Sequence, residues 1–315
     1  MAAATRRTHA VFAIESLPAE PDPRPKGAPA RHVAVIVPHR NRAADLRRFF
    51  EHFAALDARG DRFDVFVVEQ AGNDTFNRGI LLNVGFRAAR AARDYDRYIF
   101  HDVDNYPTQA MFDFYAAFPE RNVHFASPHL DYKYHYASFL GGVLGMRARD
   151  FEAANGFPTV FFGWGGEDNA FRKRLETSGA RVWRPVVGRF LLADDVQDAG
   201  NDFNPDKNLT CKYDWRHWRA NGLSRMAESK VRVTELAPAT FFEAYPAADP
   251  TRGGEADLWG RARFFEAKFA KADFQLSPAA LARGAANPAK LAAKGGARRT
   301  KRRSRSAKSP LAQSG

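Results

Sequence analysis

The chain has 315 residues, 45% of them hydrophobic and 13% aromatic, which fits one large or two ordinary folded domains. Its formal net charge of +12 resembles that of a nucleic-acid-binding protein until the charges are located. Ten Lys or Arg and no Asp or Glu lie between Ser277 and Gly315, so the rest of the chain carries only +2. The excess basic charge therefore belongs to a tail and not to the folded part.

The N-terminal segment and the cysteine content bear on the cell compartment. Residues 1–31 carry five prolines between Pro18 and Pro29 and lack an apolar run of about 18 residues, so we expect a flexible arm without a membrane span. Cys211 is the only cysteine, which excludes a disulfide within the chain and suits a reducing compartment. These features predict a soluble cytoplasmic protein, with nuclear targeting by the basic tail as an alternative.

The chain from 33 to 100 alternates apolar strands with amphipathic helices. Its first β-branched run is typical of a strand buried on both faces. Strands joined through helices by short connections predict an α/β fold with a mostly parallel sheet covered by helices on both faces. The expected elements are strands at 33–37, 63–68 and 98–100 and helices at 43–57 and 77–93.

Ligands of such sheets bind outside the carboxyl ends of the strands. The loops expected to form the site are therefore 38–42, 69–73 and 102–105. No Gly-x-Gly-x-x-Gly and no Walker-type loop follows these strands, which argues against dinucleotide oxidoreduction and P-loop chemistry.

The second half of the chain continues with shorter elements and more aromatic residues. Helical spacing and β-branched runs alternate there, and Gly156-Phe157-Pro158 interrupts them before a glycine-rich loop. The expected helices are 112–118, 150–155 and 171–177, the expected strands are 180–183 and 186–190, and 141–146 is expected to be a strand or a turn.

An acidic pair, Asp102 and Asp104, follows the third strand. Alternation puts both carboxylates on one side, close enough to share a divalent cation. Two oxygen ligands together with a nucleotide diphosphate are a usual way to hold Mg²⁺ or Mn²⁺. A solvated Asp pair that begins a turn is the alternative, and the position at a strand end favours the metal site.

A second acidic pair lies in the loop from Phe161 to Asn169, which also contains three glycines and one tryptophan. Glycines permit close approach of a ligand to the backbone, and an indole can cover it. Glu167 and Asp168 are candidates to accept hydrogen bonds from hydroxyls or to take a proton. The simpler interpretation is an acidic loop whose carboxylates stabilise a helix N-terminus.

Six motifs in order resemble the β-1,4-galactosyltransferase family, and the match covers about 33 to 236. Single motifs of this kind are weak, but six in the family's order are specific. The resemblance implies a GT-A-type α/β fold and an inverting transfer of a hexose, galactose above all, from a UDP-sugar to a carbohydrate acceptor. The motifs are Val33–Arg42, Glu69–Phe86, Asp102-Val103-Asp104, Gly141-Gly142-Val143, Gly156-Phe157-Pro158 and Gly163–Asp168.

The resemblance also implies roles on the donor side. A mobile tryptophan, Trp164, closes over the donor, and an aromatic ring at Phe139 takes the place of a tyrosine that helps to select galactose. The loss of that hydroxyl leaves the donor sugar open. The nucleotide and donor contacts implied are Pro38, Arg40, Arg42, Phe76, Arg78, Asp102 and Val103.

The acceptor and the metal follow from the same comparison. Gly165, Gly166, Glu167 and Asp168 bind the acceptor sugar, with Asp168 as the base that deprotonates its hydroxyl. Asp104 is a metal ligand for Mn²⁺. The family's Met and His ligands align with Leu192 and Asp195, so Asp195, or its neighbour Asp194, would supply an oxygen ligand and admit Mg²⁺.

Other departures concern the acceptor and the compartment. The family's hydrophobic acceptor pocket aligns with Asn208-Leu209-Thr210-Cys211, so the acceptor need not be N-acetylglucosamine. His217 is a distant alternative metal ligand, and its neighbours Trp215 and Trp218 favour packing instead. Family members are membrane-anchored, disulfide-linked Golgi enzymes, and this sequence shows neither feature.

We expect four segments: a flexible arm (1–31), a glycosyltransferase domain (32–236), a C-terminal extension packed on it (237–276) and a disordered basic tail (277–315). The tail is a candidate for contact with a polyanion.

Two other functions stay open. A nucleotidyltransferase could use the same Asp-x-Asp metal site, although the acidic pair of the central loop suits a sugar acceptor better. A catalytically degenerate sugar- or nucleotide-binding protein, recruited by its basic tail, would explain the loss of two types of metal ligand.

Overall fold

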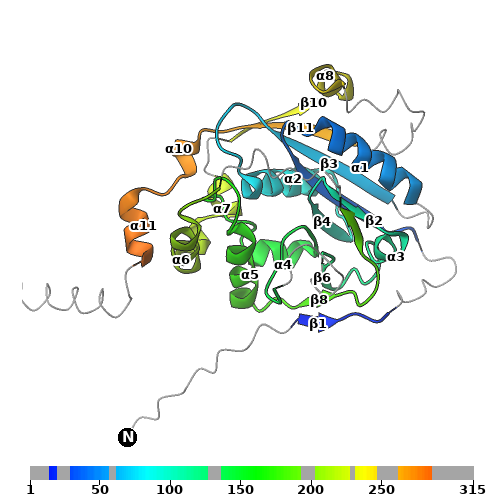
Figure 1. Cartoon of the computed structure of the whole chain (residues 1–315), viewed down its shortest axis with the longest axis horizontal. Helices are drawn as coiled ribbons and strands as arrows, with labels where there is room; N and C mark the ends of the chain where they lie inside the picture. The colour runs from blue at the N-terminus through cyan, green and yellow to red at the C-terminus, as the bar shows by residue number, and fades with distance from the viewer. Residues whose placement is uncertain are drawn as a thin grey trace, which may run out of the picture.

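The computed structural model describes residues 14–19, 29–56, 62–126, 136–192, 203–227, 231–246 and 262–285. Within these residues the centre of the fold is one nine-stranded sheet (Figure 1). Its strands are, in spatial order, β1 (Ile14–Ser16), β8 (Val182–Arg184), β6 (Asn122–His124), β7 (Val143–Met146), β4 (Arg97–His101), β2 (His32–His39), β3 (Arg62–Gln70), β11 (Arg263–Lys268) and β10 (Arg232–Leu236).

The sheet is mostly parallel, as the alternation of strands and helices predicts. β2 pairs in parallel with both β3 and β4, which places the ends of these three strands at one edge. Antiparallel pairing is confined to β7, between β4 and β6, and to β10 at the margin. The expected α/β class is confirmed.

Helices cover both faces of the sheet (Figure 1). On one face lie α1 (Ala43–Leu56), α3 (Gln109–Phe112) and α8 (Pro238–Ala244), whose buried aromatic rings join the odd-numbered side chains of β2. On the other face lie α2 (Arg78–Ala92), α4 (Ala148–Ala153), α5 (Glu167–Ser178) and α7 (Leu223–Ala227). The apolar run of β2 is buried throughout because both of its faces are covered.

A third apolar cluster lies beside the main sheet. It joins Phe161 of the glycine-rich loop to Cys211 of α6 (Lys207–His217) and to Ala280 of α11 (Pro278–Ala285). Helices α6 and α11 lie side by side (Figure 1). The short helices η1 (Trp218–Ala220) and α10 (Lys271–Phe274) connect these parts to the rest of the fold.

Two local expectations differ from the structure. The helix expected at 112–118 is wrong, because α3 ends at Phe112 and the following residues form turns that lead to Phe118, which has a φ of 51°. The strand expected at 186–190 begins only at Phe190, since Gly188 adopts a φ of 84° before β9 (Phe190–Leu192) pairs with β5 (Asn105–Pro107).

Both expected flexible ends contribute to the fold. Residues 14–16, expected in the arm 1–31, form an edge strand in parallel register with β8. Residues 278–285, expected in the tail 277–315, form α11, and Ala280 is buried against the third cluster. Short apolar segments flanked by polar residues gave too weak a pattern to predict either element.

The C-terminal extension contributes a strand to the sheet, a closer association than packing on the domain surface. β11 pairs in parallel with β3 over Arg263–Ala267, and Phe264 and Phe265 enter the cores on opposite faces. Tyr245, just after α8, donates a hydrogen bond of 2.7 Å to Glu69 at the end of β3, and Nδ1 of His39 contacts the other oxygen of this carboxylate. The extension therefore reaches the edge where the ligand loops begin.

Candidate active site

Two arginines follow β2 at the ligand edge of the sheet. Asn41, with a φ of 55°, turns the chain so that Arg40 and Arg42 leave the strand in different directions. The guanidinium of Arg40 lies 5.1 Å from the centroid of the Phe76 ring and donates to the carbonyl of Asp74 at 2.5 Å. Arg40 therefore connects the loop after β2 to the loop after β3.

Arg42 turns toward the acidic pair. Its Nη1 lies 3.1 Å from Oδ2 of Asp104, and its Nε donates to Asp45 at 2.8 Å. Burial opposes the charge of Arg42, but the two carboxylates outweigh it and raise the pKa of the guanidinium. The residue is therefore a fixed cation beside Asp104.

Asp102 and Asp104 leave the end of β4, with Asp104 only 7% exposed. The backbone N–H of Asp102 donates to the carbonyl of Gly142 at 3.1 Å, which ties this turn to the glycine pair before β7. Oδ1 of Asp104 accepts a hydrogen bond from the Asn105 amide at 3.3 Å. Both carboxylates are thus held at the strand end, as the acidic motif predicts.

Arg78 occupies the first position of α2. Its place is set by the preceding Asn77, whose Oδ1 accepts from the N–H of Ile80 at 3.0 Å and whose amide donates to the carbonyl of Thr159. The Nε of Arg78 donates to Asp102 at 2.7 Å, and its Nη1 lies 3.9 Å from the Glu167 carboxylate. Arg78 therefore connects the two acidic pairs that the sequence separates by more than sixty residues.

The central loop needs its glycines for the conformation that presents these carboxylates. Gly163, Gly165 and Gly166 have φ values of 82°, 103° and 101°, a region that L side chains rarely adopt. A Cβ at Gly166 would also lie 2.8 Å from the Phe161 ring. Helix α5 begins directly afterwards, so Glu167 and Asp168 lie in its first turn, where the helix dipole favours negative charge.

Glu167 and Asp168 form a coupled, mostly buried acidic pair. Burial and the charge of Asp168 raise the pKa of Glu167 to about 7, although Arg78 opposes the shift. Burial also raises the pKa of Asp168, against a 2.8 Å hydrogen bond from the N–H of Asn169. Among the described residues, Oε2 of Glu167 is buried without a hydrogen-bond partner. The pair can therefore hold a proton near neutral pH and accept a further donor.

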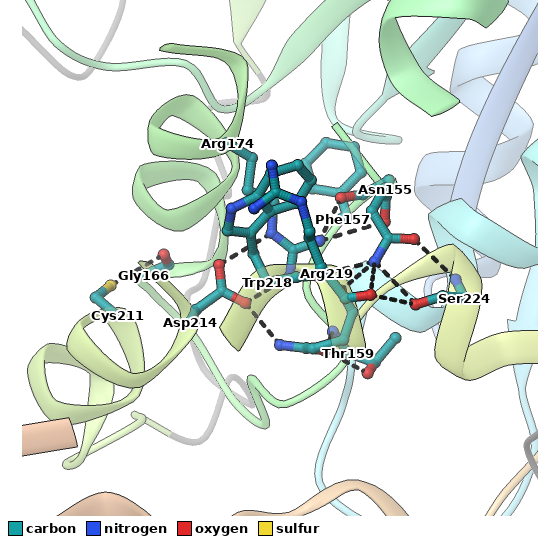
Figure 2. Close-up of polar contacts among 12 residues, drawn as sticks. Asn155, Phe157, Thr159, Gly166, Arg174, Cys211, Asp214, Trp218, Arg219 and Ser224 are labelled. Carbon is teal, nitrogen blue, oxygen red and sulfur yellow. Dashed lines mark hydrogen bonds and ion pairs between the residues drawn. The ribbon is translucent and has the colours of Figure 1, made fainter. Parts of the chain in front are cut away.

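A buried ion pair fixes α6 against α5 (Figure 2). Arg174 of α5 donates through two nitrogens to Asp214 of α6, with Nε to Oδ2 at 2.9 Å, and both side chains are fully buried. Its third nitrogen donates to the carbonyl of Gly156 at 2.7 Å. Asn221 donates to the same carboxylate at 2.6 Å, so the buried charges have hydrogen-bond partners. Nearer the two N-termini, Sγ of Cys211 donates to the carbonyl of Gly166 at 3.4 Å, so α6 begins beside α5.

Trp164 lies at the open side of this arrangement, with 42% of its surface exposed. It forms a parallel bridge with Phe203, and its carbonyl accepts from the N–H of Asn204 at 3.3 Å. The ammonium of Lys207, at the start of α6, lies 5.1 Å from the Trp164 ring centroid. An exposed indole held beside the acidic pair can cover a bound ligand.

The structure brings most of the expected site residues together, but three of them present little surface. Val103 is 3% exposed and lies in the hydrophobic core, so its side chain is not available to a nucleotide sugar. Phe139 is 4% exposed and lies beside Gly141, which is itself next to Asp168. Pro38 is buried within β2. Of this group, only backbone atoms or a small ring edge can reach a ligand.

The expected metal site is described only in part. Asp104 lies at the right strand end, and Leu192, the last described residue of β9, pairs with the neighbouring Asn105. Asp194 and Asp195 lie outside the described residues. Within the described residues there is no group of three His, Cys, Asp or Glu arranged for a metal ion. His217, at the far end of α6, is exposed and not packed in the core as expected; its ring contacts that of Tyr213, with centroids 4.5 Å apart.

Sequence reasoning missed four residues of the site's surroundings. The ion pair of Arg174 with Asp214 was not predicted, because nothing in a single sequence marks two charged residues forty positions apart as partners. Phe203 and Lys207 were not predicted, because only the alignment of the nearby residues 208–211 with the family's acceptor pocket was considered. The signal available was an aromatic residue and a lysine around Pro205, just before a helix.

Comparisons with known proteins agree with this geometry. Residues 13–116 match the family described as the N-terminal region of glycosyl transferase group 7, and residues 121–193 match the one described as the N-terminal domain of galactosyltransferase. Human β-1,4-galactosyltransferase 4 is 32% identical over 206 residues, which cover 64% of this chain and 60% of the human protein. β-1,4-Galactosyltransferase 2 of Cricetulus griseus is 36% identical over 222 residues, 69% of this chain and 59% of that protein. The chain thus matches about 60% of the length of these curated relatives.

Two solved structures show the same fold. Drosophila β-1,4-galactosyltransferase 7 with xylobiose has a TM-score of 0.54 and 28% identity, over 70% of this chain and 99% of the other. A mutant of the same enzyme with manganese, UDP-Gal and xylobiose has a TM-score of 0.50 and 32% identity, over 57% of this chain and 79% of the other. The expected GT-A type is confirmed by this similarity.

The prediction of a cytoplasmic location is wrong. The relatives are β-1,4-galactosyltransferases, which are Golgi enzymes, so composition and the single cysteine misled the interpretation. Among the described residues, no helix is both long and apolar enough to cross a membrane.

Proposed function

Because the chain belongs to the β-1,4-galactosyltransferase family, we propose that it is a metal-dependent inverting galactosyltransferase that uses UDP-galactose and a carbohydrate acceptor. The observation that carries the proposal is Arg78, which contacts Asp102 at 2.7 Å and lies 3.9 Å from Glu167. One cation thereby holds the acidic turn of the donor side against the acidic pair of the acceptor side. A site for two substrates needs such a fixed relation between its halves.

The loops after β2 and β3 are the proposed nucleotide site. Arg40 over the Phe76 ring gives a cationic and aromatic surface, and Arg42 beside Asp104 gives a second cation near the diphosphate. Arginine suits phosphate because its planar guanidinium presents several donors at once. The nucleotide would contact backbone atoms at the strand ends, at Pro38, Asp102 and Val103, rather than exposed apolar side chains.

The burial and the negative charge of Asp104 suit a ligand of a divalent cation. It is a mostly buried carboxylate whose charge is only partly matched by Arg42, and oxygen donors suit Mn²⁺ and Mg²⁺. We propose Asp104 and Asp195, with Asp194 as the substitute, as protein ligands. When bound, the cation supplies positive charge against the leaving diphosphate.

The acidic pair is the proposed acceptor site. Asp168 takes the proton from the acceptor hydroxyl as the oxygen forms a bond to the anomeric carbon and the bond from that carbon to the diphosphate breaks. Glu167, with its unpartnered Oε2, accepts a hydrogen bond from the acceptor sugar and holds a proton near neutral pH. One protonated and one ionised carboxylate side by side is the arrangement expected when like charges share a buried site.

The test is to incubate the full chain with UDP-galactose and Mn²⁺, with and without sugar acceptors, and to measure released UDP and the galactosylated product. We expect slow UDP release without acceptor and faster release with one. Binding of UDP-galactose without any release would instead support a degenerate binding protein. Formation of UTP and galactose 1-phosphate on addition of pyrophosphate, without release of UDP, would support a nucleotidyltransferase.

Two further parts of the proposal concern the metal and the tail. Mn²⁺ and Mg²⁺ are separated by comparing UDP release after metal removal and re-addition of each ion. A contact of the basic segment 277–315 with a polyanion is proposed from its charge, and its affinity should fall steeply with salt.

A further inference from the structure

Lys207 lies over two exposed aromatic rings beside the acceptor loop. Its ammonium is 5.1 Å from the centroid of Trp164 and 4.6 Å from that of Phe203, and the two centroids are 6.5 Å apart. Trp164 is 42% exposed and Phe203 is 59% exposed, so neither side chain is buried in the hydrophobic core. A cation over exposed aromatic rings offers a ligand both a charge and flat apolar faces.

The charge of Lys207 has no acidic partner among the described residues. Other cations of the neighbouring helix are paired: Arg172 and Lys173 with Glu176, and Arg174 with Asp214. Within the described part of the chain, the side chain of Lys207 lies over the two aromatic rings and beside Gly165 and Gly166. A lysine ammonium is a compact charge with three donors, and the rings leave these donors available to a ligand.

Lys207 lies beside the glycine loop that leads to the acidic pair. A Cβ at Gly165 would lie only 3.5 Å from Nζ of Lys207, and one at Gly166 would lie 3.1 Å from its Cβ. The two residues that follow Gly166 are the proposed acceptor-binding carboxylates. The buried contact of Arg174 with Asp214, further along the two helices, holds α6 against α5 (Figure 2).

We infer that the acceptor carries an anionic group, which Lys207 binds while Trp164 and Phe203 cover the adjoining sugar ring. This rests on the proposed function and names the class of its acceptor. A single ammonium matches a single negative charge, so a uronic acid carboxylate or a sulfate ester suits it. An ordinary neutral sugar would give the ammonium of Lys207 no counter-charge.

The test compares two glycosides that differ only at one carbon. Methyl β-D-glucuronide carries a carboxylate where methyl β-D-glucoside carries a hydroxymethyl group, and the galacto pair differs in the same way. Binding of each to the full chain, in the presence of UDP and Mn²⁺, is measured by calorimetry and by the fluorescence of tryptophan. We expect at least one uronide to bind about tenfold or more tightly than its neutral partner, the size of one charge-assisted hydrogen bond.

Three variants make the test specific. Lys207→Met keeps the length of the side chain and should bring the ratio of affinities to near one, while binding of the neutral glycoside stays within about twofold. Lys207→Arg keeps the charge and should retain most of the preference. Lys212→Met, at an exposed position of the same helix, should leave the ratio unchanged. A merely structural lysine would affect both glycosides alike.

Several outcomes would overturn the inference: no preference for the uronide or for a 6-O-sulfated glucoside over the neutral glycoside, no detectable binding of either anionic glycoside, or a preference that survives Lys207→Met. Tighter binding of a 6-O-sulfated glucoside that also depends on Lys207 would support the inference and assign the anion to a sulfate ester. UDP release from UDP-galactose reports separately on the proposed function. A preference for anionic glycosides in a chain that never releases UDP would refute the proposed transfer and leave the anionic ligand site standing.

Discussion

Nη1 of Arg78 lies 3.9 Å from Oε1 of Glu167, so the first residue of one helix contacts the first residue of another across the site. The contact lowers the pKa of Glu167 against the combined effect of burial and of Asp168. Arg78 therefore sets the pH at which the acidic pair loses its shared proton.

Arg78→Gln should move the acidic limb of the pH–rate profile of transfer to higher pH. The base Asp168 must be ionised, and removal of the cation takes away an interaction that opposes protonation of both Asp168 and Glu167. Arg78→Lys, which keeps the charge, should restore most of the original profile. The measurement is kcat/KM for the acceptor between pH 5.5 and 9, values chosen to bracket a pKa of about 7. A profile that does not move would separate Arg78 from the titration of the pair.

Asp104→Asn should reduce transfer by at least about 10²-fold while circular dichroism and thermal unfolding show an intact fold, because the variant keeps the size of the side chain and loses a charged metal ligand. The dependence of UDP release on Mn²⁺ should shift to much higher concentrations. Turnover that is unchanged at saturating Mn²⁺ would remove Asp104 from the metal site.

The variants Asp168→Asn and Glu167→Gln should affect different kinetic constants of the transfer reaction. The first keeps the shape but removes the basic oxygen, so kcat should fall by roughly 10²–10⁴ with little change in donor affinity. The second should raise the acceptor KM at least as clearly as it lowers kcat. Slow hydrolysis of UDP-galactose by water should survive Asp168→Asn, since the donor side is untouched. Transfer by Asp168→Asn at the parent rate would show that this residue is not the base.

Glu167 should also make the fold less stable as pH rises. Its pKa is raised from 4.5 to about 7, so between these values the folded chain binds more protons than the unfolded chain. The free energy of unfolding therefore falls through this window, by up to roughly 3 kcal/mol, and levels off above it. In urea titrations without metal, Glu167→Gln should flatten this slope and be more stable than the parent at pH 8. Glu120→Gln, at an exposed side chain, is the control and should follow the parent.

Two truncations should separate α11 from the basic residues that follow it. Deletion of 286–315 should leave turnover on a small acceptor within a few-fold. Deletion of 277–315 also removes α11, whose Ala280 packs in the cluster that contains Phe161 and Cys211. We expect the longer deletion to lower thermal stability and to weaken acceptor binding, because that cluster supports the glycine-rich loop. Equal behaviour of the two truncated proteins would show that α11 does not support the site.

The strands and helices of the first half could be predicted because each is long and periodic. β2, α1, β3 and α2 lie within a residue or two of their expected bounds, and the acidic turn after β4 follows from the same pattern. The acidic pair after Gly166 could be recognised from residue types alone. What could not be predicted depends on pairing between distant segments.

The joining of β1 to β8 and of β11 to β3 illustrates the limit. Neither segment has a hydrophobic period strong enough to predict its partner, and each is stabilised only once the rest of the sheet is present. The relation of Arg78 to Glu167 is of the same kind, since it arises where two helices begin rather than within one motif. The role inferred for Lys207 could not be predicted either, because the sequence does not show which lysines lack an acidic partner in the folded chain.

The pairing of β11 with β3 also has a consequence for biosynthesis. β2 precedes β3 in the chain and can pair with it at once, but β11, the partner on its other side, is synthesised much later. Until then, a long apolar strand presents unpaired N–H and C=O groups along one edge, the kind of edge that templates aggregation. During synthesis, chaperones that bind this edge would therefore reduce aggregation of the nascent chain. A chain that stops before β11 would keep the edge of β3 unpaired, so we expect it to aggregate rather than to fold into an active truncated protein.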